Sequence, residues 1–204
     1  MRSLKFWFMS LLTSCASFHS SLEKTVTYSP ELFVPISWIE NKSHLAMNLH
    51  YPPVQKVKEQ VDANLPIPLK TRGEAHITVI TPPEYEKLKT FLSMERINAI
   101  AVQHNIQQFA FKPFCLGRGR LQIDGHEEST YFMVVDSTDL STLRKHIKEA
   151  FILAGGSPKD FDENLFFPHV TVGFTKRDLH FEDGILKNKN SCWQNLTETS
   201  AQGV

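Results

Sequence analysis

One four-residue pattern occurs twice in this chain and constrains its fold more than any other feature. The copies are His76-Ile77-Thr78-Val79 and His169-Val170-Thr171-Val172, and each has the order His, apolar, Thr, apolar. Because side chains of a β-strand alternate between the two faces of a sheet, each copy predicts a strand with a polar and an apolar face. One copy could arise by chance among nine His. Two copies indicate a pair of related strands, each anchored in a core.

The segments around the two copies have strand and helix patterns. Strands are expected over residues 44–51, 75–80, 108–122, 130–136 and 170–174, and helices over 54–64, 82–91, 94–104 and 140–151. Asp124-Gly125 is a hairpin signal, and Gly155-Gly156 ends the last helix. A set of strands and helices that occurs twice, without strict βαβ units, predicts an α+β fold with two similar lobes.

The N-terminus has the pattern of a targeting signal. Arg2 and Lys5 precede an apolar run over residues 6–12, which is too short to span a bilayer but suits the core of a signal peptide. The following Leu12-Thr13-Ser14-Cys15 resembles the bacterial lipobox, in which the cysteine is lipidated. We expect export to the cell envelope or periplasm, with Cys15 as the only membrane anchor. Secretion with cleavage after Ala16 and an uncleaved leader on a cytoplasmic protein are the alternatives.

These patterns divide the chain into four parts. We expect a signal peptide over residues 1–15, a Ser- and Thr-rich tether over 16–35, a folded domain over 36–186 and a polar tail over 187–204. Lys+Arg and Asp+Glu balance at 22 each, which argues against a protein that coats long nucleic acid. A small phosphate ligand needs only a few local donors, so it remains compatible with this charge.

Two cysteines remain if Cys15 carries a lipid. An oxidising compartment would permit a disulfide between Cys115 and Cys192, but the sequence does not show that they meet. We expect two separate thiols.

The paired histidines predict acid–base chemistry on phosphate esters. Cleaving a phosphodiester or opening a cyclic phosphate needs one group to deprotonate the nucleophile and another to protonate the departing oxygen. Imidazole can do either at neutral pH, so His76 and His169 are the candidate catalytic residues. Thr78 and Thr171 are expected to donate hydrogen bonds to the non-bridging phosphate oxygens. This arrangement requires no cofactor and no metal, and the spacings of His44, His50 and His180 match no common zinc site.

Several cations and one aromatic residue complete the set of candidate substrate-binding residues. Arg118 and Arg120 should share one strand face and could bind a phosphate or an RNA backbone, although a solvated edge strand explains them equally well. Arg72 precedes the first motif and Lys176 follows the second, so both could border a cleft. Tyr131 could stack on a base.

The two motifs resemble the signature of the two-histidine (2H) phosphoesterase superfamily, which includes RNA 2′,3′-cyclic phosphodiesterases, also called 2′-5′ RNA ligases. The surroundings of the first motif, residues 72–82, look most like its Swiss Army knife RNA repair-like branch. The resemblance covers about residues 40–185. It implies a bilobal α+β fold, with two antiparallel sheets and flanking helices around a central cleft. It also implies metal-independent hydrolysis of 2′,3′-cyclic phosphates or 2′-5′ phosphodiesters by His76 and His169.

Two other functions remain open from the sequence. A non-catalytic, nucleotide-binding envelope lipoprotein would keep the cleft and bind without turnover. A metal-dependent hydrolase would lose its activity in a chelator. We expect RNA ends or small nucleotides as the substrate and a monomer as the oligomeric state.

Overall fold

A computed structural model describes residues 25–28 and 43–199 of the chain. Within them the strands are β1 (Val26–Tyr28), β2 (Leu45–Leu49), β3 (Ala75–Ile80), β4 (Lys112–Ile123), β5 (His126–Asp136), β6 (His169–Phe174) and β7 (Cys192–Glu198). The helices are α1 (Tyr51–Asp62), α2 (Pro82–Leu88), α3 (Met94–Gln103) and α4 (Thr138–Leu153), with short 3₁₀ turns η2 (Ile106–Gln108), η3 (Phe181–Asp183) and η4 (Lys189–Ser191). The expected signal peptide and Cys15 lie outside the described residues.

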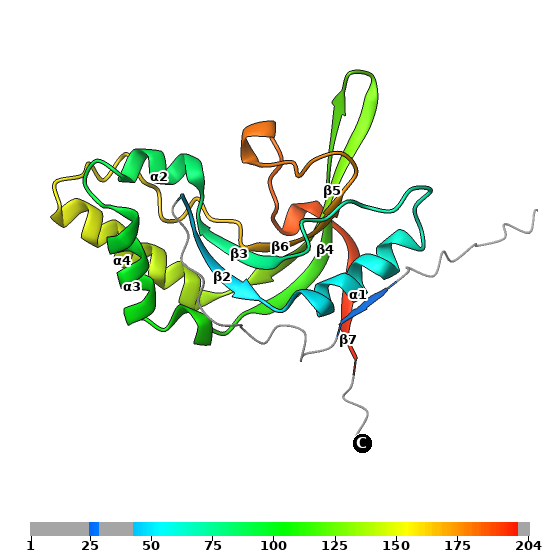
Figure 1. Ribbon diagram of the computed structural model, residues 1–204, viewed down its shortest axis with the longest axis horizontal. Helices are drawn as coiled ribbons and strands as arrows, with labels where there is room; N and C mark the ends of the chain where they lie inside the picture. Colours follow the sequence, from blue (N-terminus) through cyan, green and yellow to red (C-terminus); the bar gives the residue numbers. More distant parts are fainter. Residues whose placement is uncertain (1–24, 29–42, 200–204) are drawn as a thin grey trace, which may run out of the picture.

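The seven strands join one curled sheet in the order β1-β7-β4-β5-β6-β3-β2. Neighbouring strands are antiparallel, except that β1 and β7 are parallel. Figure 1 shows α2, α3 and α4 grouped at one end of the sheet and α1 at the other. The α+β fold is confirmed, but its strands form one continuous sheet where the family resemblance implied two.

The main core lies on one face of this sheet. Ile77 and Val79 of β3 and Val170 and Val172 of β6 are all buried in it, together with the apolar faces of α1, α3 and α4. The alternation read from the two motifs therefore holds, and the histidines and threonines are left on the opposite face.

Local signals explain where the helices begin and end. Thr81 and Glu84 form a reciprocal capping box at the start of α2, with prolines in its first two positions. Ser137 caps α4 by accepting a hydrogen bond from the Leu140 N–H at 3.2 Å. The hairpin predicted at Asp124-Gly125 is confirmed, with φ of 51° and 78° at these two residues.

Two segments expected to be irregular are strands. The polar tail predicted from residue 187 is wrong as far as Thr199, because η4 and β7 lie in it and β7 pairs with β4. Val26–Tyr28 of the predicted tether forms β1 and pairs with β7. Most of β7 is exposed, so it lacks the apolar alternation that marks a strand in a sequence. Its pairing partners on both sides hold it in place.

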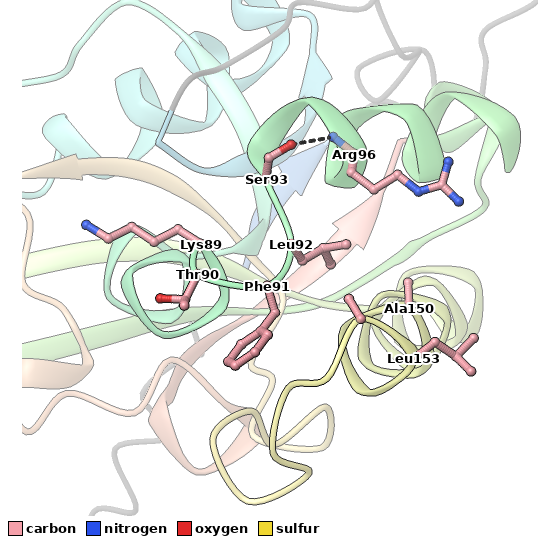
Figure 2. A pocket seen from close by; sticks show the side chains of 9 residues that line it. Lys89, Thr90, Phe91, Leu92, Ser93, Arg96, Ala150 and Leu153 are labelled. Atoms are coloured by element: carbon pink, nitrogen blue, oxygen red, sulfur yellow. Dashed lines mark hydrogen bonds between the residues drawn. The ribbon is translucent and has the colours of Figure 1, made fainter.

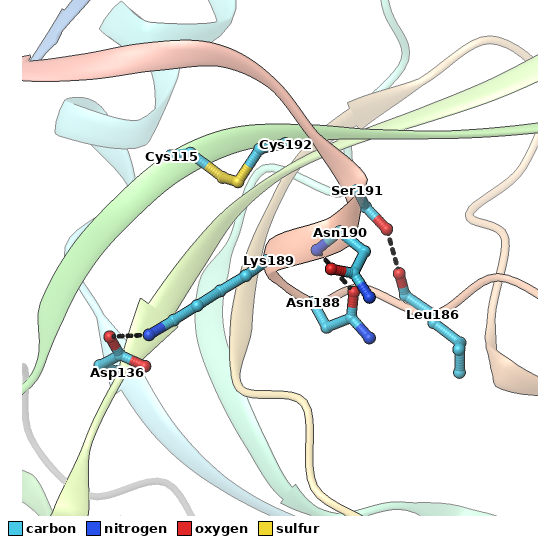
Figure 3. The surroundings of a disulfide bond; sticks show 8 residues. All are labelled: Cys115, Asp136, Leu186, Asn188, Lys189, Asn190, Ser191 and Cys192. Carbon is cyan, nitrogen blue, oxygen red and sulfur yellow. Dashed lines mark hydrogen bonds and ion pairs between the residues drawn. A yellow bond between two sulfur atoms is a disulfide. The ribbon is translucent and has the colours of Figure 1, made fainter.

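A disulfide joins β7 to β4, so the prediction of separate thiols is wrong. Cys115 and Cys192 are bonded with their Cα atoms 5.7 Å apart, a normal separation for a disulfide. Figure 3 shows the bond beside the short segment that leads from Leu186 to Cys192. The bond joins residues 77 positions apart in the sequence and fixes β7 to β4.

An open cavity of about 580 Å³ lies among the helices, between the α2–α3 connection and the end of α4. Phe91, Leu153 and Arg96 are among its lining residues (Figure 2). It contains none of the residues predicted to be functional. Across the described ranges, every helix is too short or too polar to cross a membrane.

Candidate active site

The two motifs lie side by side in antiparallel orientation on the neighbouring strands β3 and β6, next to the edge strand β2. Ile77 of β3 is paired with Val170 of β6. In an antiparallel pair, this register places His76 opposite Thr171 and Thr78 opposite His169. All four side chains are partly exposed on the face opposite the main core. The strand pairing therefore gathers two imidazoles and two hydroxyls in one small area.

His169 is held in one tautomer by the backbone that precedes it. Its Nδ1 lies 2.8 Å from the carbonyl oxygen of Phe167. A carbonyl oxygen only accepts hydrogen bonds, so Nδ1 carries the proton of the neutral ring and Nε2 keeps a lone pair. Burial, and next the charge of Lys187, lower the pKa of His169 well below its ordinary value. The ring is thus a neutral proton acceptor at pH 7.

His76 lies in a more mixed environment. Its Nδ1 is 4.0 Å from a carboxylate oxygen of Glu74, and its ring centroid is 6.2 Å from that of His44. Burial lowers the pKa of His76, the Glu74 charge opposes this, and His44 and Arg72 add to the lowering. The pKa of His76 is thus lowered overall, while the nearby Glu74 carboxylate partly offsets the effect of burial.

A buried carboxylate connects the second motif to its surroundings. Asp178 accepts hydrogen bonds from the Thr130 hydroxyl at 2.6 Å, the Lys187 ammonium at 2.8 Å and the Thr171 hydroxyl at 3.2 Å. Burial alone would raise the pKa of Asp178, but the charge of Lys187 and the hydrogen bonds from Lys187 and Thr130 hold it below its ordinary value. The carboxylate is therefore charged at neutral pH, and it takes the single donor of Thr171.

A small pocket opens between the motifs. It is lined by Thr71, Arg72, Glu74, His76, Thr171, Phe174 and Asp178. Arg72 is exposed and contributes a cation to this lining. The pocket therefore combines an imidazole, a guanidinium and hydroxyls with the carboxylates of Glu74 and Asp178.

This geometry agrees with a comparison of the sequence with protein families. A model of the Swiss Army Knife 2H phosphoesterase domain matches residues 43–180, more than half of the chain. The chain belongs to the 2H phosphoesterase superfamily. No curated protein and no solved structure matches it.

Three of the predicted substrate-binding residues of this 2H phosphoesterase lie on the wrong face. Arg118 is opposite Tyr131 in the β4–β5 register, and Arg120 shares its face two residues on. Tyr131 is 1% exposed and belongs to the main core, whereas the adjacent Phe132 lies edge-on to His169 with ring centroids 5.9 Å apart. Alternation predicted that the two arginines share a face, but it could not say which face carries the histidines.

These arginines have structural contacts instead. Arg118 bonds Glu127 at 2.7 Å and stacks against Tyr131 and Trp193. Arg120 is paired with the same Glu127 at 3.5 Å. Lys176 is exposed in the loop after β6 and does not line the pocket.

Sequence reasoning missed Asp178 and Lys187. Neither residue lies in a motif, and Lys187 was assigned to the polar tail. A short polar segment gives no sign that one of its lysines is buried, because burial here depends on the return of β7 to the sheet. Across residues 25–28 and 43–199 of this 2H phosphoesterase, His, Cys, Asp and Glu do not gather into a group of three that could hold a metal ion.

Proposed function

We propose that this 2H phosphoesterase hydrolyses a 2′,3′-cyclic phosphate or a 2′-5′ phosphodiester at an RNA end or in a small nucleotide. The observation that carries the proposal is the antiparallel pairing of the two motifs through Ile77 and Val170, which brings both histidines to one site. Arg72 supplies a cation there for the phosphate. Thr78 supplies a hydroxyl for a non-bridging oxygen.

The surroundings of the two histidines support different roles. His169 acts as the general base, since its Nε2 keeps a lone pair while Nδ1 donates to Phe167. His76 is then left as the general acid, and the Glu74 carboxylate 4.0 Å from its Nδ1 opposes the lowering of its pKa by burial. An arriving phosphate anion adds to this effect.

The reaction balances without a further reactant. A water oxygen attacks phosphorus while its proton moves to Nε2 of His169. The bond between phosphorus and the ribose oxygen breaks, and His76 gives its proton to that oxygen. The product is a phosphomonoester from a cyclic phosphate, or a phosphomonoester and an alcohol from a diester.

We also propose that the protein works in an exported, oxidising location. The Cys115–Cys192 disulfide supports this proposal, because such bonds persist mainly outside the cytoplasm. RNA fragments or nucleotides of the cell envelope or periplasm would then be the substrates. A lipid anchor at Cys15 remains a prediction outside the described residues.

Turnover of a defined substrate panel tests the reaction. The full chain is assayed in EDTA with 2′,3′-cyclic nucleotides and with short 2′-5′ and 3′-5′ oligonucleotides. We expect hydrolysis that survives the chelator and falls by about 10²–10⁴-fold in His76→Ala and in His169→Ala. His126→Ala, at an exposed position outside the site, is the matched control and should retain full activity.

Each other outcome has a clear meaning. Binding of a cyclic nucleotide by the folded protein without turnover would favour the non-catalytic binder. Loss of activity in EDTA would favour a metal-dependent hydrolase.

A further inference from the structure

A lysine beyond the family-matched segment reaches the candidate active site. The family model ends at residue 180, and Lys187 lies in the connection between η3 and η4. Its side chain is nevertheless 4% exposed, with Nζ 2.8 Å from Asp178 and 5.5 Å from the centre of the Phe132 ring. Because an unpaired buried ammonium is costly, the contact with Asp178 is what makes this position tenable.

Asp178 carries the effect of Lys187 to the second motif. One carboxylate oxygen accepts from Lys187 and Thr130, and the other accepts from Thr171 at 3.2 Å. Nε2 of His180 lies 4.0 Å from the same carboxylate oxygen that accepts from Thr171. Lys187 thus holds the group that orients the motif threonine.

Lys187 and His169 share one aromatic neighbour. Both side chains pack against the same ring, since Phe132 is 5.9 Å from the His169 ring and 5.5 Å from the Lys187 ammonium. The charged and titratable groups that act on His169 are Lys187, Asp178 and His76. Lys187 is the fixed cation among them.

The segment that delivers Lys187, residues 185–192, is held at several points. Ile185 fills the space above Gly119, where a side chain on β4 would clash with it. Ser191 donates a hydrogen bond to the Leu186 carbonyl, Lys189 pairs with Asp136, and the disulfide fixes Cys192 (Figure 3). These contacts give Lys187 a defined position rather than that of a mobile surface lysine.

We propose that Lys187 is a positioning residue for the second motif: it fixes Thr171 through Asp178, and its charge opposes a second positive charge on His169. The proposal deepens the proposed function, on which its consequence for turnover rests. Lys187, which lies outside the family-matched segment, would then influence the general base His169. The lowering of the His169 pKa by burial and by Lys187 agrees with this role.

Titration of the His169 imidazole by NMR tests the proposal without a substrate. Removing a nearby like charge should raise the pKa of His169, so Lys187→Met should move its midpoint upward by about one pH unit. Lys187→Arg keeps the charge and should leave the midpoint within a few tenths of a unit. Lys189→Met, at an exposed lysine of the same segment, should leave it unchanged.

A double variant avoids leaving a buried carboxylate without its cation. Lys187→Met leaves the Asp178 carboxylate buried without its cation, so Lys187→Met/Asp178→Asn is measured beside it. We expect a smaller rise in the double variant, because the carboxylate that favours a charged His169 is removed as well. An unchanged midpoint in folded Lys187→Met, or a midpoint in the double variant equal to that of Asp178→Asn alone, would overturn the proposal.

Kinetics separate this proposal from the proposed function. Since the base must be neutral, the acidic limb of the kcat/KM profile should move to higher pH in Lys187→Met and stay in place in Lys187→Arg. A protein that turns over no substrate but shows the NMR shift would refute the proposed function alone. Normal turnover with an unshifted His169 would refute the role of Lys187 alone.

Discussion

The two motif threonines occupy equivalent sequence positions but differ in their contacts. Thr171 donates its hydroxyl proton to Asp178. The Thr78 hydroxyl has no hydrogen-bond partner in the described part of the chain. A hydroxyl has one donor, so Thr78 is free to donate to a phosphate, whereas Thr171 would first have to leave Asp178. The prediction that both threonines donate to the substrate therefore requires different changes at the two positions.

Substitution by valine should separate these two roles. Thr171→Val removes a donor from the buried Asp178 and should lower the free energy of unfolding by about 1 kcal/mol. Thr78→Val should change it by less than about 0.5 kcal/mol but should reduce kcat/KM about 10–10³-fold. Urea unfolding and initial rates measure the two quantities. Equal losses of stability in the two variants would contradict the assignment.

At this scale the sequence predicted the residues that are close together in the chain. The motif residues could be recognised because each motif places a histidine and a threonine two residues apart in one strand. They are His76 and Thr78, and His169 and Thr171. Lys187 was missed, since it reaches the site only through long-range strand pairing. The failure at Arg118 has another cause: a period of two gives relative faces and not absolute ones.

A single arginine of α4 organises the elements that lead into β6. Arg144 is 1% exposed and bonds Glu84 of α2 at 2.8 Å and the Val79 carbonyl of β3 at 2.6 Å. It also donates to the carbonyls of Asp162, Glu163 and Leu165. The segment that ends at His169 is thus tied to the helices through one guanidinium.

Arg144→Met should be strongly destabilising. It leaves Glu84 and several carbonyl oxygens without their donor, and breaking such a buried pair costs about 3–5 kcal/mol. Lys89→Met removes an exposed pair with Glu86 and should cost less than about 1 kcal/mol. Thermal or urea unfolding of both variants measures the difference. A similar, small change in both would show that Arg144 does not have this structural role.

Most elements were predictable because their signals are local. Capping residues, prolines and apolar periodicity located α2, α3 and α4 to within a few residues. β7 was not predictable, because its exposed side chains carry no periodic pattern. Its place depends on hydrogen bonds to β4 and β1, which are remote in sequence.

At the scale of the whole fold, a disulfide joins β4 to β7. Because β7 follows directly after the segment that carries Lys187, the bond stabilises both the sheet and the candidate site. The α+β class could be predicted from the repeated strand-and-helix pattern. The joining of all seven strands into one sheet could not be predicted, because it depends on which strands pair along their edges.

Reduction should therefore weaken the fold. We expect a phosphine reductant to lower the free energy of unfolding by about 2–4 kcal/mol, the usual contribution of a disulfide. Urea unfolding with and without reductant measures this change. A Cys115→Ala/Cys192→Ala variant is the control and should unfold identically in both conditions. An equal reductant effect in this variant would show that the disulfide is not the cause.

The pairing of Ile77 with Val170 also creates a local twofold axis between β3 and β6. Rotation about this axis exchanges His76 with His169, so the motifs alone offer a phosphodiester the same groups in either orientation. Which ester oxygen departs must then be decided by charges that the rotation does not repeat. Glu74 beside His76, and Asp178 with Lys187, are charges of this kind. In the proposed reaction, the duplicated residues supply the reactive groups and the unduplicated charges give the cleavage its direction.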